Sequence, residues 1–71
     1  MALIAINVRN QLRGIIKAVV WGDAVSEIEV ETAAGIITSV ITTRSIKDLK
    51  LEIGSKVLAL IKATDVSIAK I

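Results

Sequence analysis

Residues 57–66, VLALIKATDV, combine an apolar run with a single lysine and a polar turn. Five apolar residues precede Lys62 without a break, and such a run is typical of a strand that is buried on both faces. A small polar turn, residues 63–65, follows the lysine at once. Because an unpaired buried ammonium group is costly, Lys62 either extends to water or binds an anion. The run itself leaves both alternatives open.

The composition predicts association with other chains. At 71 residues the protein is expected to form one domain, residues 1–71, near the lower size limit for an independent core. Hydrophobic residues make up 54% of the chain. So small a domain is unable to bury all of their apolar surface. The apolar runs are far shorter than the roughly 20 residues that cross a bilayer, and residues 1–6 lack the basic start of a signal peptide. We therefore expect a cytoplasmic homo-oligomer without a membrane partner.

Several residue types that catalysis requires are missing. The chain has no cysteine and no histidine, so it lacks thiolate metal ligands and the commonest general base. It also lacks a glycine-rich phosphate loop and a serine next to a candidate base. The net charge is only +2, and Trp21 is the one aromatic residue, which argues against nucleic-acid binding by a basic stripe or by stacking. The sequence predicts a non-enzymatic binding protein with no nucleic-acid partner.

Hydrophobic patterns predict five short strands. The first contains Gly14, which suggests a bulge or a sharp bend. The second alternates with period two and exposes three glutamates to water, and the residues Gly22 and Asp23 predict the turn between these two strands. Another turn is expected at residues 33–35. The five expected strands are residues 12–21, 25–31, 36–42, 57–62 and 66–70.

A short helix is expected between the third and fourth strands. Thr43 is placed as its N-cap, ahead of residues 44–49. Ile46 and Leu49 lie three residues apart and should share one face. A helix of about two turns is too short to be stable alone, so it should pack against one end of the sheet. This order of elements predicts an all-β, five-stranded OB-fold-like barrel with one short helix between strands 3 and 4.

Two polar segments supply the donors that a small anion requires. Residues 7–11, NVRNQ, precede the first strand, and residues 62–64, KAT, end the fourth. Successive backbone N–H groups in turns also bind anions. From these residues alone, the two segments could meet within one chain or across a subunit boundary.

The same segments carry a resemblance to a known family. Residues 8–14 (VRNQLRG) with Lys17, residues 41–49 (ITTRSIKDL) and residues 59–66 (ALIKATDV) resemble the molbindins, the small Mop-type molybdate-binding proteins. The molbindin domain, also called TOBE, occurs as well at the ends of molybdate-transporter ATPases and molybdate-responsive regulators. The resemblance extends from about residue 6 to residue 70, and its first and last segments are specific when they occur together.

The resemblance implies a function, an assembly and a site. The function is cytoplasmic binding of molybdate or tungstate for storage and homeostasis, so that metal enters only within the oxyanion. The assembly is a homo-hexamer, a trimer of dimers, with the oxyanions at subunit interfaces. Lys62 would supply charge, Thr64 a hydroxyl and the backbone near Ala63 N–H donors, whereas Arg9 either contacts the ligand or pairs with a glutamate across the interface. The implied oxyanion-binding residues are Asn7, Arg9, Asn10, Gln11, Lys62, Ala63 and Thr64.

Two positions depart from the family pattern. The family usually has serine at the position of Asn7, so the longer amide changes the geometry there. Relatives commonly have a small neutral residue at the position of Asp23, where a carboxylate would repel an oxyanion. The segment 22–25 is therefore not included in the expected site. An alternative function is an interaction or regulatory module whose assembly is modulated by oxyanion binding.

Overall fold

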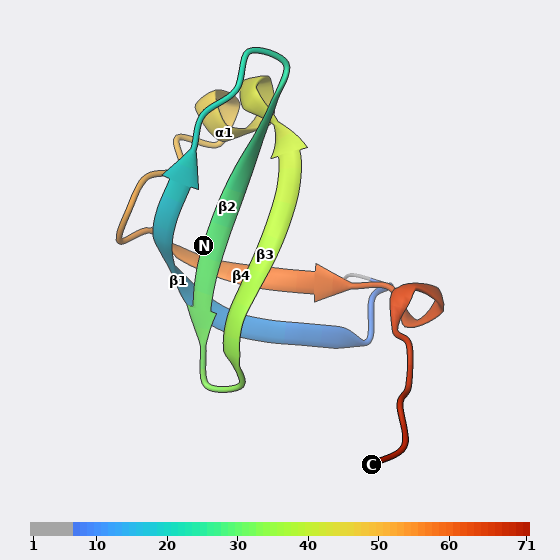
Figure 1. Ribbon diagram of the computed structural model, residues 1–71. Helices are drawn as coiled ribbons and strands as arrows, with labels where there is room; N and C mark the ends of the chain where they lie inside the picture. The colour runs from blue at the N-terminus through green and yellow to red at the C-terminus, as the bar shows by residue number, and fades with distance from the viewer. Residues whose placement is uncertain (1–6) are drawn as a thin grey trace.

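The chain forms a curled sheet of four antiparallel strands (Figure 1). The computed structural model describes residues 7–71, so the apolar segment 1–6 lies outside the described residues. The elements in chain order are β1 (Asn10–Val20), β2 (Val25–Thr32), β3 (Gly35–Thr42), α1 (Thr43–Asp48), β4 (Lys56–Ile61) and the 3-10 helix η1 (Ala63–Asp65). The strands follow the order β3-β2-β1-β4 in the sheet. This half-barrel confirms the predicted OB-fold-like β architecture and the position of its helix.

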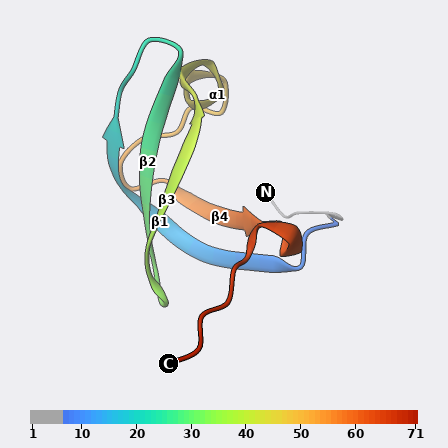
Figure 2. The same ribbon diagram turned by 45° about the vertical axis from the view of Figure 1, so that its right-hand side comes forward.

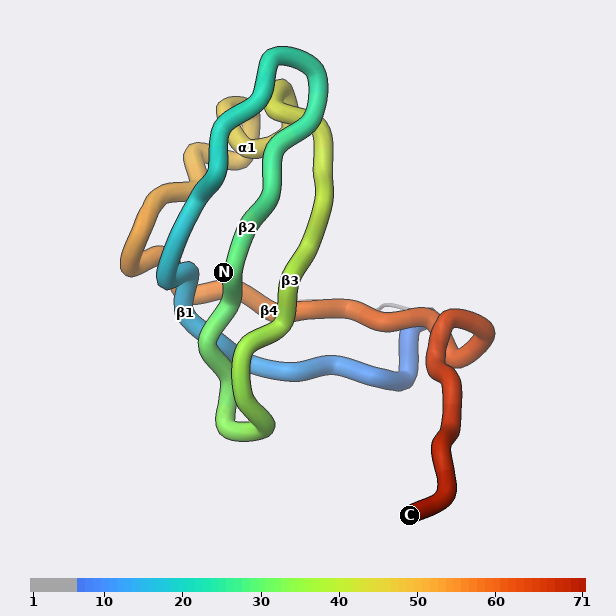
Figure 3. Tube along the Cα trace, viewed as in Figure 1, coloured from blue at the N-terminus to red at the C-terminus, as the bar shows by residue number. Residues whose placement is uncertain are grey.

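Strand β1 makes the sheet curl. Its first half pairs with β4, from Asn10 opposite Ile61 onward, and its second half pairs with β2. The two halves run in clearly different directions (Figures 1 and 3). Gly14 belongs to both ladders, and a Cβ there would lie 2.5 Å from Cγ1 of Val30 and 2.6 Å from the backbone oxygen of Glu31. The bend expected at Gly14 is present, because only a residue without a side chain permits this close approach.

The irregularity in strand pairing lies at Lys17 rather than at Gly14. The register shifts between Ile16 and Ala18, so Lys17 is the additional residue of a bulge. After the bulge, Val19 pairs with Ile28 and packs against the core. Without the extra residue, the small Ala18 would have taken the position that faces the core.

The core lies on the concave face of the sheet. Alternation along β2 is confirmed, because Ser26, Ile28 and Val30 are buried while Glu31 is exposed and the other two glutamates are half-buried. Ile46 of α1 is completely buried against this face. The buried cluster consists of Ile16, Ile28, Val30 and Ile46, flanked by the partly buried Val19, Ile37, Ile41, Leu51 and Val57.

Helix α1 begins one residue earlier than the sequence predicts. Thr42, not Thr43, is the N-cap, and its Oγ1 accepts a hydrogen bond of 3.1 Å from the backbone N–H of Ser45. Thr43 is instead buried and donates a 2.7 Å hydrogen bond to the carbonyl of Gly22. Its hydroxyl also lies 2.6 Å from that of Ser26. Burial explains the shift, since the enclosed hydroxyl of Ser26 requires a partner that Thr43 provides.

The expected helix face and the expected fourth strand also need correction. Leu49 is 67% exposed, and Leu51 packs against the core in its place. The chain turns back after α1, with the N–H of Leu51 donating to the carbonyl of Ile46 at 3.0 Å. Strand β4 ends at Ile61, one residue before Lys62, and is half-buried rather than enclosed on both faces.

The predicted fifth strand, residues 66–70, is wrong for this chain. Beyond η1 the backbone is extended but belongs to no sheet, and it runs away from the strands (Figures 1 and 2). Within the described residues, no further strand lies beside β3 or β4, the two edge strands, so the barrel that these residues form is open. Among residues 7–71, no helix is long and apolar enough to cross a membrane.

Candidate functional site

The last residue pair of the β1–β4 ladder brings two distant segments together. Asn10 begins β1 and lies opposite Ile61, which ends β4. Residues 7–9 and 62–64 therefore leave the sheet at the same place, next to η1 (Figures 1 and 2). Strand register thus places the two polar segments side by side within one chain.

A pocket of about 270 Å³ lies between these segments. Residues 62–64 contribute Lys62, Ala63 and Thr64, and residues 7–9 contribute the rest of the lining. All of these residues except Val8 are implied by the family resemblance as site residues. Val8 lacks a polar side chain, so no signal in the sequence marks it as part of a binding site. The complete lining is Asn7, Val8, Arg9, Lys62, Ala63 and Thr64.

The pocket is positively charged. Arg9 and Lys62 both line it, and no acidic residue does so among the described residues. Within residues 7–71 neither cation takes part in the ion pairs, which join Lys17 to Glu31 and Arg44 to Asp48. The amide of Asn7 and the hydroxyl of Thr64 add neutral donors. Cations and neutral donors around one small hollow suit an oxyanion that accepts hydrogen bonds on several sides.

The start of η1 borders the same pocket. Lys62 is its N-cap and forms no side-chain capping hydrogen bond. The first hydrogen bond of the helix runs from the N–H of Asp65 to the carbonyl of Lys62, at 2.9 Å. The N–H groups of Ala63 and Thr64 thus have no partner inside the helix. Ala63 and Thr64 both line the pocket, although Asp65 brings a carboxylate nearby in the chain.

Asn10 and Gln11 lie beside the pocket rather than in its lining. The side-chain amide of Asn10 donates a 3.0 Å hydrogen bond to the carbonyl of Ile61, which ties the start of β1 to the end of β4. That of Gln11 donates a 2.7 Å hydrogen bond to the carbonyl of Val8, which holds the segment before β1. Both amides therefore fix the backbone on either side of the pocket.

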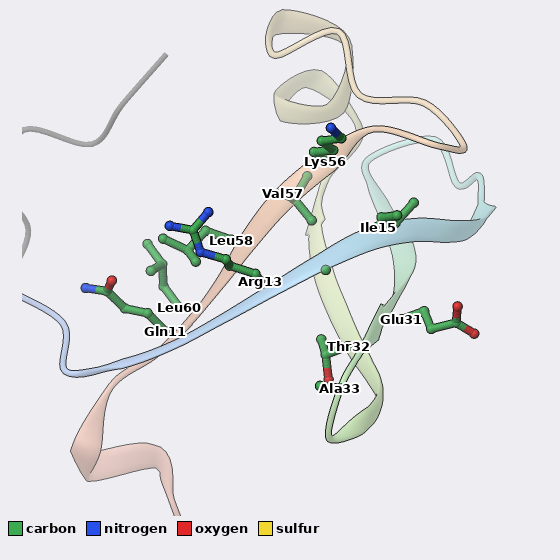
Figure 4. A pocket seen from close by; sticks show the side chains of 11 residues that line it. Gln11, Arg13, Ile15, Glu31, Thr32, Ala33, Lys56, Val57, Leu58 and Leu60 are labelled. Carbon is green, nitrogen blue, oxygen red and sulfur yellow. The ribbon is translucent and has the colours of Figure 1, made fainter.

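A larger hollow of about 1220 Å³ runs along β1 and β4 (Figure 4). Gln11 and Arg13 of β1 face Leu60 and Leu58 of β4 there, in register. On its far side lie Glu31, Thr32 and Ala33 of the β2–β3 hairpin. The groove is open and partly aliphatic, and its lining includes the carboxylate of Glu31. Size alone therefore does not make it the candidate site.

Comparison with known proteins identifies the family. Residues 6–68 match the model of the TOBE domain, so the chain belongs to the TOBE domain family. Molybdenum-pterin-binding protein 3 of Clostridium pasteurianum is 43% identical over 65 residues, which are 90% of this chain and 96% of that protein. This relationship confirms the resemblance, and it confirms a binding protein rather than an enzyme.

Solved structures of similar chains share the fold. A molybdate-binding protein from Sporomusa ovata is 34% identical, with a TM-score of 0.89. The match covers 94% of this chain and 100% of that protein. ModG, described as a cytoplasmic molybdate-binding protein, is 31% identical with a TM-score of 0.81. The match to ModG covers 86% of this chain and 44% of ModG.

Proposed function

We propose that the chain binds molybdate in the pocket between residues 7–9 and 62–64. The observation that carries this proposal is the meeting of Arg9, Lys62 and Thr64 at the end of the β1–β4 ladder. The similarity to a molybdenum-pterin-binding protein and to a molybdate-binding protein supports the choice of ligand. Tungstate has the same charge and shape, and it is the second ligand that we propose.

Each implied residue has a role in this proposal. Lys62 and Arg9 neutralise the dianion, and charge-assisted hydrogen bonds of this kind are about twice as strong as neutral ones. Thr64 contributes its hydroxyl, and the backbone of Ala63 and Thr64 contributes N–H donors. Asn7 contributes its amide. Asn10 and Gln11 act indirectly, because their side-chain amides hold the two backbone segments that form the pocket.

Selection of molybdate over sulfate is proposed to depend on cavity size. Both ions are tetrahedral dianions, so charge and hydrogen-bonding capacity do not distinguish them. A rigid pocket discriminates by size better than a flexible loop does. The strand register and the amides of Asn10 and Gln11 supply that rigidity here.

The biological role that we propose is storage of the oxyanion in the cytoplasm by a homo-hexamer, a trimer of dimers, with the sites at subunit interfaces. Exposed apolar side chains support association: Trp21 and Val40 are 56% and 65% exposed, and water disfavours so much apolar surface on a small monomer. Storage predicts that the assembly takes up more than one anion per subunit. The alternative, a module whose assembly responds to the anion, predicts fewer than one anion per subunit.

Titration calorimetry with molybdate tests the proposed function directly, with sulfate as a competitor in a parallel series. We expect molybdate to bind and an excess of sulfate to leave that binding unchanged. Absence of molybdate binding would contradict the function, and equal competition by sulfate would contradict the size-selection argument. Native mass spectrometry of the same samples counts the anions for each assembly and separates storage from the regulatory alternative.

A further inference from the structure

Val8 differs from the other residues that line the pocket of about 270 Å³ between residues 7–9 and 62–64. Its side chain is branched and apolar, whereas the rest of the lining consists of two cations, an amide, a hydroxyl and the small Ala63. Val8 is also half-buried, while the other five lining residues are all exposed. Within residues 7–71, Val8 is therefore the one member of the lining that its surroundings partly enclose.

The backbone at Val8 is held in place as well. The side-chain amide of Gln11 donates a 2.7 Å hydrogen bond to the carbonyl of Val8, three residues earlier in the chain. Two residues after Val8, the amide of Asn10 is tied to the end of β4 at Ile61. Valine adds stiffness of its own, because branching at Cβ restricts χ1. Both the position and the rotamer of Val8 are thus constrained.

The other side of the pocket is also defined by backbone hydrogen bonds. Residues 62–64 lead into η1, where the N–H of Asp65 donates a 2.9 Å hydrogen bond to the carbonyl of Lys62. The last pair of the β1–β4 ladder joins this segment to the one that contains Val8. The width between Val8 and the start of η1 therefore depends on the backbone and not on side chains that adjust to each ion.

The charged side chains of the lining provide no comparable measure of size. Arg9 and Lys62 are long and exposed, and side chains of this kind retain much rotamer freedom. They are able to approach a small dianion as readily as a large one, so they stabilise sulfate and molybdate alike. Selection by size requires a side chain whose rotamer is fixed by its surroundings, and Val8 meets this requirement.

We propose that the side chain of Val8 determines the size of the oxyanion that the pocket prefers. This inference rests on the proposed function, because it concerns the selectivity of the same pocket. An ion as large as molybdate contacts the methyl groups of Val8 on one side and residues 62–64 on the other. A smaller ion leaves a gap at one of these walls, and atoms across such a gap lose their contact. Gln11 is a positioning residue here, because it holds Val8 in place.

Calorimetry with molybdate and selenate tests the role of Val8. Selenate is a tetrahedral dianion larger than sulfate and smaller than molybdate. Val8→Ala removes a contact that molybdate makes and a smaller ion does not, so we expect the preference for molybdate, expressed as the ratio of the two Kd values, to fall. The expected fall is about tenfold, the low end of the effect that one methylene has on selectivity in a fitted pocket. Val8→Ile narrows the same gap and should shift the preference toward selenate.

Two control variants separate the shape of Val8 from general effects. Val8→Thr keeps the branched shape, so it should preserve the ratio of the Kd values, although its hydroxyl changes the affinity for both ions. Val25→Ala removes the same two methyl groups from an exposed position at the start of β2, outside the lining of the pocket. It should leave the ratio at the wild-type value. Circular dichroism shows whether each variant is folded like wild type.

Gln11→Met provides a second measurement. Methionine is similar in length but has no amide donor, so the carbonyl of Val8 loses the hydrogen bond that holds it. We expect the preference for molybdate to fall as it does in Val8→Ala. An equal loss of affinity for both ions would instead show that Gln11 binds the ion directly, and it would overturn the positioning role.

The possible outcomes distinguish this inference from the proposed function. A wild type that prefers molybdate, together with Val8→Ala and Val8→Ile variants that keep the wild-type ratio, would overturn the role of Val8 and leave the function intact. A fall in Val25→Ala as large as that in Val8→Ala would also overturn it. A wild type that binds no molybdate would contradict the function itself, and the inference with it.

Discussion

Gly14 shows how the absence of one side chain permits the curl of the sheet. The residue lies where β1 changes from pairing with β4 to pairing with β2, and a Cβ there would lie 2.6 Å from a backbone oxygen of β2. A backbone atom is unable to move aside as the tip of a flexible side chain would. We therefore expect Gly14→Ala to destabilise the chain by about 1–3 kcal/mol through overpacking.

Urea unfolding followed by tryptophan fluorescence or circular dichroism measures this effect. Thr38→Ala, at an exposed position of β3, serves as the control and should stay within about 0.5 kcal/mol of wild type. An unfolding midpoint of Gly14→Ala equal to that of wild type would show that β1 bends by other means.

Lys62 carries the second prediction at the residue scale. Its ammonium lines the pocket beside Arg9, and hydrogen bonds to charged groups contribute about 1.5–3 kcal/mol. We expect Lys62→Ala to weaken molybdate binding by at least about tenfold, since 1.4 kcal/mol corresponds to that factor. Calorimetry measures the change, with Lys47→Ala on the exposed side of α1 as the control that removes the same charge elsewhere. An equal loss in both variants would indicate a general effect of net charge and not a specific contact.

At the scale of elements, two adjacent threonines at the start of α1 have different roles. Thr42 caps the helix from an exposed position, and loss of such a cap costs about 1 kcal/mol. Thr43 is buried and satisfies the carbonyl of Gly22 and the hydroxyl of Ser26. Thr43→Val preserves the shape but leaves the buried hydroxyl of Ser26 without this partner, and a buried group left unsatisfied costs about 1–3 kcal/mol.

We therefore expect Thr43→Val to lower the free energy of unfolding more than Thr42→Ala does. Chemical denaturation of both variants gives the comparison. The reverse order would mean that capping of α1 matters more than the link between α1 and the β1–β2 loop.

The elements also show what the sequence could and could not predict. Alternation in β2 marks one buried face and was read correctly. The segment IIKAVV of β1 is apolar on both sides of Lys17, so its pattern does not reveal the bulge that turns Val19 inward. Capping rules favoured Thr43, because a pattern does not show which of two threonines will be enclosed. The fifth strand was predicted from a real alternation, but pattern alone does not say whether a partner strand lies within reach.

The sequence likewise predicts some features of the candidate site and not others. Motif resemblance indicated Lys62 and Thr64, since charged and hydroxyl side chains mark donors. Their meeting with residues 7–9 depends on the pairing of Asn10 with Ile61, and register between distant strands is not visible in local patterns. The amides of Asn10 and Gln11 were expected to contact the ligand, but in the chain they bind backbone carbonyls. That they also help to bind the anion stays a prediction.

At the scale of the whole molecule, a ligand that binds only the folded state must stabilise it. At a free concentration of about 100 times Kd, one site adds about 2.7 kcal/mol to the free energy of unfolding. We expect molybdate to raise the Tm of wild type, and sulfate at equal concentration to leave it unchanged. The variant Lys62→Ala should require a correspondingly higher molybdate concentration for the same rise. A rise of equal size in sulfate would mean that general salt effects, and not the pocket, stabilise the fold.

Assembly should show itself in the thermal unfolding of the unliganded protein. In the part of the chain that the structure describes, Val40, Ile53 and Ile68 are largely exposed, and the barrel is open at two edges. If these surfaces are buried between copies, unfolding is coupled to dissociation, and mass action makes the Tm depend on protein concentration. We expect the Tm of wild type to rise across about a hundredfold range of concentration. The same Tm at every concentration of wild type would mean that the half-barrel unfolds as a monomer and that its exposed apolar surface has no partner in a second copy.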